Sequence, residues 1–136
     1  MHRAVPLAAL IGLLALAANV PGADAATPTG FAFGRLGGNI RSFHVTIANS
    51  GAVRAFGPVT VGRTRITAAQ LVALNRIATE TSFTTLPAMT SCRGSLPDVA
   101  TTYVRVGALT VRVHGGCVPR FQRLLKALET SVRLSG

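Results

Sequence analysis

Two kinds of hydrophobic periodicity alternate along this chain, and their order limits the folds that it can adopt. Apolar residues recur at every second position over Phe43–Ala48 and again over Leu109–His114, which is typical of half-buried strands. They recur at helical spacing after Thr67 and after Pro119. We therefore predict an α+β domain in the order ββαββα, in which two hairpins form one antiparallel sheet and two helices cover one face.

The ends of these elements carry local signals. Thr67 and Gln70 have the spacing of a capping box, so we expect the first helix to begin there. Pro87 forbids its continuation, and Pro119 suits the first turn of the second helix. The segment Val59–Arg65 fits either a further edge strand or an extended loop.

The first 25 residues have the order of a secretory signal peptide. A short basic start precedes an apolar run over residues 4–18, which is too short to span a bilayer, and Ala23-Asp24-Ala25 forms a cleavage site. An uncleaved N-terminal anchor is the alternative. We expect residues 26–41 to be a flexible lead-in rich in Gly and Thr, although Phe31 and Phe33 suggest a short strand or an anchor onto the core. Residues 42–136 would form a single α+β domain.

The two cysteines, Cys92 and Cys117, are expected to form a disulfide. Export delivers a chain to an oxidising compartment, where an even number of cysteines usually pairs. The alternative is a cysteine nucleophile with His44 or His114 as its base, but pairing would remove the thiolate that this chemistry needs. Zinc-ligand spacing is absent from the sequence, so we expect no metal. The exported protein should be secreted or held in the cell envelope without spanning a membrane.

The charge is strongly one-sided. The chain has 14 Lys and Arg residues against 4 Asp and Glu residues, a formal net charge of +10. Such a balance favours anionic partners, for example envelope polymers. The arginines are dispersed and no aromatic stacking platform accompanies them, so we do not expect a nucleic-acid partner.

Strand alternation predicts which side chains point away from the helices. If both helices cover one face, the other face displays threonine, arginine and histidine side chains with one tyrosine. The residues displayed on that face are His44, Thr46, Arg54, Thr101, Tyr103, Arg105, Thr110, Arg112 and His114, and all of them except Thr101 and Thr110 form the candidate binding face of seven residues. It is interpreted either as an ordinary solvated sheet face or as a binding surface for an acidic or extended partner.

A second candidate site is the loop that Cys92 anchors. A rigid exposed segment is what a protease inhibitor requires, and the loop over Ser91–Asp98 could supply one. Its candidate residues are Arg93, Ser95, Leu96 and Asp98. The alternative is a plain connector. The inhibitor hypothesis predicts that Cys92→Ser loses binding more than it loses fold.

Catalytic motifs are scarce. After the predicted cleavage site the chain has only three acids, and it contains no G-x-S-x-G, no H-E-x-x-H and no phosphate-binding loop. We therefore predict a protein that is not an enzyme and needs no cofactor. A small hydrolase built around His114 and Asp98 remains an alternative.

The second half of the chain resembles the emfourin-type family of small bacterial proteins, some of which inhibit metalloproteases of the thermolysin class. The resemblance covers residues 43–132 and is carried by Phe83, Leu86-Pro87, Asp98, Tyr103–Val106, Thr110–Val113, Val118-Pro119, Leu124-Leu125 and Leu128. It implies the hairpin–helix–hairpin–helix layout and an inhibitory activity, but assigns no inhibitory residue. The two cysteines, the export signal and the basic charge are departures from that family.

These observations lead to one main hypothesis and two alternatives. The main hypothesis is a secreted, non-enzymatic domain that binds another macromolecule, with protease inhibition as its most concrete form. The alternatives are a basic envelope-associated protein that binds anionic polymers, and the small hydrolase.

Overall fold

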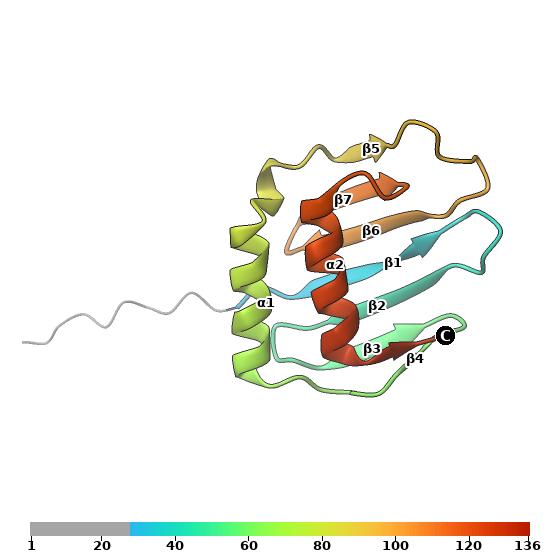
Figure 1. The fold of residues 1–136 in the computed structure, drawn as a ribbon. Helices are drawn as coiled ribbons and strands as arrows, with labels where there is room; N and C mark the ends of the chain where they lie inside the picture. The colour runs from blue at the N-terminus through green and yellow to red at the C-terminus, as the bar shows by residue number, and fades with distance from the viewer. Residues whose placement is uncertain (1–27) are drawn as a thin grey trace, which may run out of the picture.

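The structure, a computed structural model, describes residues 28–136. The predicted signal peptide lies outside the described residues. Within them the chain folds as α+β, with a six-stranded sheet behind two helices (Figure 1). None of the helices among residues 28–136 is long and apolar enough to cross a membrane.

The main sheet has the strand order β3-β2-β1-β6-β7-β5. All neighbours pair antiparallel except β5 and β7, which are parallel. The strands span Phe31–Leu36 (β1), Phe43–Ile47 (β2), Val53–Phe56 (β3), Met89–Ser91 (β5), Thr101–Val106 (β6) and Leu109–His114 (β7). The two predicted hairpins, β2–β3 and β6–β7, are present, but they do not pair with each other.

The predicted arrangement is wrong at the segment that we expected to be a flexible lead-in, because part of it is a strand of the sheet. Residues 31–36 form β1, which lies between the two hairpins and pairs with both β2 and β6. Phe31 and Phe33 point into the core and are almost completely buried. The domain therefore begins well before residue 42, because without β1 the two hairpins would not belong to one sheet.

Both helices pack on the same face of the sheet (Figure 1). Helix α1 spans Ala68–Glu80, and Thr67 with Gln70 forms the predicted capping box. A 3-10 turn, η1, follows over Phe83–Thr85. Helix α2 spans Pro119–Val132 and has its proline in the first turn, as predicted. Sequence signals at helix ends are reliable here because caps depend on neighbouring residues only.

Two short additions complete the fold. β4 (Thr60–Val61) pairs with β8 (Leu134–Ser135) in a second, two-stranded sheet. The segment Val59–Arg65 thus contains a strand, although not one of the main sheet. The predicted disulfide joins Cys92 to Cys117, with their Cα atoms 5.6 Å apart. It connects the end of β5 to the residues just before α2.

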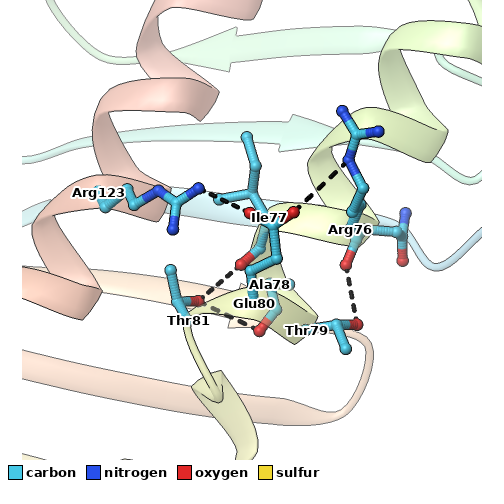
Figure 2. Close-up of polar contacts among 8 residues, drawn as sticks. Arg76, Ile77, Ala78, Thr79, Glu80, Thr81 and Arg123 are labelled. Atoms are coloured by element: carbon cyan, nitrogen blue, oxygen red, sulfur yellow. Dashed lines mark hydrogen bonds and ion pairs between the residues drawn. The ribbon is translucent and has the colours of Figure 1, made fainter.

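The acidic side chains of the helical layer, Glu80 and Glu129, are both ion-paired. Glu80, at the end of α1, forms ion pairs with Arg123 of α2 at 2.6 Å and with Arg76 of α1 at 3.8 Å (Figure 2). Glu129 of α2 lies 4.0 Å from Arg35 of β1, whose side chain therefore points to the helical side. Thr81 closes α1 by donating to the carbonyl oxygens of Ile77 and Ala78 (Figure 2).

Candidate binding face

The uncovered face of the sheet is defined by the strand register, because directly paired residues point to the same side. One row crosses all six strands in the order Phe56, His44, Gly34, Tyr103, Arg112 and Met89. A neighbouring row crosses five strands in the order Arg54, Thr46, Ala32, Arg105 and Thr110. A third row contains Leu36, Thr101, His114 and Ser91. We call the residues of these three rows the open face.

All seven residues of the candidate binding face lie on the open face. β1 separates them into two groups, with His44, Thr46 and Arg54 on one side and Tyr103, Arg105, Arg112 and His114 on the other. Had the two hairpins been neighbours, these groups would have formed one continuous patch. Instead Ala32 and Gly34 of β1, which have almost no side chain, form a low strip between them.

Tyr103 leans across this strip. Its hydroxyl forms a hydrogen bond with Nδ1 of His44, and the two rings stack with centroids 6.0 Å apart. Gly34 lies between the two residues in the register, and a Cβ there would stand 3.0 Å from Cε1 of Tyr103. Gly34 therefore provides the space in which the tyrosine ring lies, and this explains why only 9% of Tyr103 is exposed.

A shallow hollow of about 360 Å³ opens beside the tyrosine ring. Its floor and apolar wall come from Ala32 and Leu36 of β1. The polar part of the lining consists of His44, Tyr103, Arg105, Thr110 and Arg112. An apolar wall with a few convergent polar groups is typical of a ligand-binding site.

The arginines of the open face have no partner within the described part of the chain. Among residues 28–136, no ion pair or side-chain hydrogen bond engages Arg54, Arg105 or Arg112, and all three are exposed. The acids of these residues lie elsewhere: Glu80 and Glu129 on the helices, and Asp98 in a loop. The open face is therefore cationic without internal compensation.

Burial and the neighbouring arginines shift the pKa of Tyr103 in opposite directions. Burial raises the pKa of its phenol above the ordinary value, while the neighbouring guanidinium groups of Arg105 and Arg112 lower it and offset part of that rise. The phenol therefore stays protonated at neutral pH and has a proton to donate.

The imidazole of His114, although on the open face, contacts the loop that follows Cys92. Its Nε2 lies 3.1 Å from the carbonyl oxygen of Leu96, and its Nδ1 lies 3.4 Å from the hydroxyl of Thr101. The carboxylate of Asp98 accepts a hydrogen bond from Asn39 at 2.9 Å. The hydrogen bonds of the described residues thus do not join His114 to Asp98, the pair on which the hydrolase hypothesis depends.

The candidate binding loop is a tight turn at the end of the sheet. The amide of Ser95 donates to the carbonyl oxygen of Cys92 at 3.1 Å, and Gly94 has a φ of 80°. Arg93 lies exposed at this turn, and Leu96 is 64% exposed. None of the four candidates Arg93, Ser95, Leu96 and Asp98 lines the hollow beside Tyr103.

Several residues of the open face were not predicted from the sequence. Gly34, Ala32 and Leu36 belong to the segment interpreted as a lead-in, and their alternation with Phe31 and Phe33 was the available signal. Phe56 and Met89 are half exposed and end the row of Tyr103 on the two edge strands. No local pattern in the sequence places Met89 beside Arg112, because β5 joins β7 through a parallel pairing.

Residues 28–136 contain no cluster of three or more His, Cys, Asp or Glu side chains that could hold a metal ion. Comparison with known proteins found no matching family model, no similar curated protein and no similar solved structure. The open face and its hollow must therefore be interpreted from their own chemistry.

Proposed function

We propose that this chain is an exported, non-enzymatic binding domain that holds an acidic protein on the open face of its sheet. One observation carries the proposal: the open face combines unpaired arginines with exposed aromatic and apolar side chains. Arg54, Arg105 and Arg112 supply the charge, while Phe56 and Met89 are 53% and 50% exposed on the same surface.

The composition of this surface favours a protein over a simple polyanion. Protein interfaces are enriched in Tyr, Phe, Met and Arg and depleted of Lys, Glu and Asp. The open face contains the first four types and none of the last three among its residues. A polymer held by charge alone needs neither an apolar wall nor a hollow.

The disulfide and the lack of a membrane-spanning helix among the described residues fit a secreted or extracellular protein. The resemblance to the emfourin-type family makes an exported protease the first acidic partner to test. Protease inhibition is thus the most concrete form of the proposal, and the open face is the surface that we expect to make the contact.

The test is affinity capture from the exported proteins of the source organism, with the disulfide intact. We expect an acidic protein to be retained by the wild type and by Arg93→Gln, which removes one positive charge from the loop. The combined variant Arg54→Gln/Arg105→Gln/Arg112→Gln should lose it. Equal retention by the two variants would overturn the proposal.

Salt separates this proposal from the envelope alternative. The net charge of +10 alone would attract anionic polymers, and such attraction weakens as salt screens it. Retention of a discrete protein at high salt supports the open face as an interface. Retention of anionic polymer only, lost at high salt, would favour the envelope-associated protein.

A further inference from the structure

We infer that the hollow beside Tyr103 is a carboxylate-binding site, which receives one Asp or Glu side chain of the acidic partner. This inference rests on the proposed function and assigns the ligand chemistry of one place on the open face. It depends on two arginines, a tyrosine and a threonine that line one hollow together with the apolar residues Ala32 and Leu36.

The donors match a carboxylate in charge and number. Arg105 and Arg112 are free of ion pairs among the described residues, and each guanidinium can donate two parallel hydrogen bonds to a carboxylate. Thr110 pairs with Arg105 in the register and lines the same hollow, and its side chain carries a hydroxyl that can donate. No acid lines the hollow to compete with the ligand.

Tyr103 can donate a further hydrogen bond. Its hydroxyl is held by Nδ1 of His44, and the imidazole can act there as donor or as acceptor. When Nδ1 of His44 carries the hydrogen, the phenol accepts from the imidazole and its own proton is free to point at a carboxylate oxygen. The hydrogen bond between His44 and Tyr103 can therefore persist whether the hollow is empty or holds a carboxylate.

The apolar wall explains why an amino-acid side chain is favoured over a free anion. Leu36 is 41% exposed and lines the hollow with Ala32. The methylene groups of a glutamate would cover this wall while the carboxylate meets the arginines. A small inorganic anion would leave it in water.

The chain offers a direct probe, because Tyr103 is its only tyrosine and there is no tryptophan. The protein with its disulfide intact is titrated with a short blocked peptide in which one glutamate is flanked by leucines, and tyrosine emission is followed. The matched peptide has glutamine in place of glutamate. We expect a dissociation constant of about 1 mM for the glutamate peptide and no saturable change with the glutamine peptide.

Matched variants separate the hollow from the general charge of the face. Arg112→Gln and Arg105→Gln should each weaken the glutamate peptide about tenfold. Arg54→Gln removes the same charge from the same face outside the hollow and should change binding by less than about twofold. Equal losses in Arg54→Gln and Arg112→Gln would overturn the assignment, as would equal binding of the two peptides.

Inorganic phosphate is the third probe. Saturable binding of phosphate without binding of the glutamate peptide would overturn the carboxylate assignment in favour of a phosphoryl ligand. The proposed function fails separately, because it depends on capture by the whole face. If the peptide does not bind but capture still requires the three arginines, the carboxylate assignment falls and the binding domain stands.

Discussion

The two sides of the main sheet differ in whether acidic side chains lie beside their arginines. On the helical side Glu80 bridges Arg76 and Arg123 (Figure 2), and Glu129 lies beside Arg35. On the open face Arg54, Arg105 and Arg112 have no acidic neighbour among the described residues. Arginines of the first kind link the sheet and the helices to one another, whereas those of the second kind remain available for an outside partner.

The apolar side chains show the same contrast. On the helical side the phenylalanines Phe31 and Phe33 are buried against the helices. On the open face Phe56 and Met89 remain half exposed, although burying each would stabilise the fold. An exposed aromatic side chain beside unpaired arginines is better explained by a partner surface than by stability of the isolated domain.

The largest expected effect is a difference in the free energy of unfolding between a substitution on the helical side of the sheet and one on the open face. Phe33→Ala, in the core side of β1, should lower the free energy of unfolding by about 3–5 kcal/mol because it leaves a cavity in a fully buried position. Thr46→Val on the open face should change it by less than about 0.5 kcal/mol. Urea unfolding followed by circular dichroism measures both, and similar losses would mean that both faces are covered.

Removing the disulfide tests the loop against the open face. Cys92→Ser/Cys117→Ser should cost about 3.5 kcal/mol of stability, since it frees the residues between β5 and α2 in the unfolded chain. We expect partner binding by the folded fraction to persist, because the register of β6 and β7 does not depend on this link. Lost binding in a folded variant would instead support the loop that contains Arg93 as the inhibitory segment.

Gly34→Ala should affect both the stability of the fold and the position of Tyr103 on the open face. The added Cβ would collide with the carbonyl oxygen of Phe43 and stand 3.0 Å from the ring of Tyr103. We expect a loss of about 2 kcal/mol in stability, typical of overpacking, together with displaced tyrosine emission. Ala32→Ser, two residues earlier on the same face of β1, is the control. An unchanged tyrosine signal in Gly34→Ala would contradict the role given to Gly34.

The charges themselves should have small effects on stability. Glu80→Gln breaks two exposed ion pairs and should cost less than about 1 kcal/mol while leaving binding unchanged. Arg112→Gln should leave the unfolding free energy nearly unchanged and weaken binding. Thermal unfolding and peptide titration on the same two variants check the contrast, which fails if Glu80→Gln weakens binding as well.

The smallest effect is the pH dependence that Tyr103 contributes. Its pKa in the folded protein lies above the ordinary value of a phenol, chiefly through burial. The unfolded chain therefore loses the phenolic proton first, and stability should fall as the pH rises above about 10. Tyr103→Phe should lack this part of the fall. A tyrosinate absorbance titration gives the pKa directly, and a value below 10 would contradict the burial of the ring.

Local signals predicted much of the fold. The capping box of Thr67, the proline at the start of α2 and the alternation over β2, β6 and β7 each depend on residues a few positions apart. The disulfide followed from there being only two cysteines. The alternation also placed seven candidate residues on one face before any strand pairing was known.

The arrangement of these elements was not predictable in the same way. β1 was hidden in a glycine-rich segment, and its place between the hairpins depends on pairing with β6, which lies far along the chain. The hollow depends on that pairing, because Ala32, Leu36 and Gly34 come from β1. Sequence reasoning therefore found the charged residues of the open face but not the strand that shapes the space between them.

By itself the sequence determined the two helices, the hairpins β2–β3 and β6–β7, and the side to which the residues of those hairpins point, because these follow from the local geometry of the backbone. Only the tertiary structure decided that Gly34 of β1, which has no side chain, separates His44 from Tyr103 and lets the two meet across it. Strand order and register are set by contacts between distant segments, and those contacts form the hollow in which Arg105 and Arg112 converge.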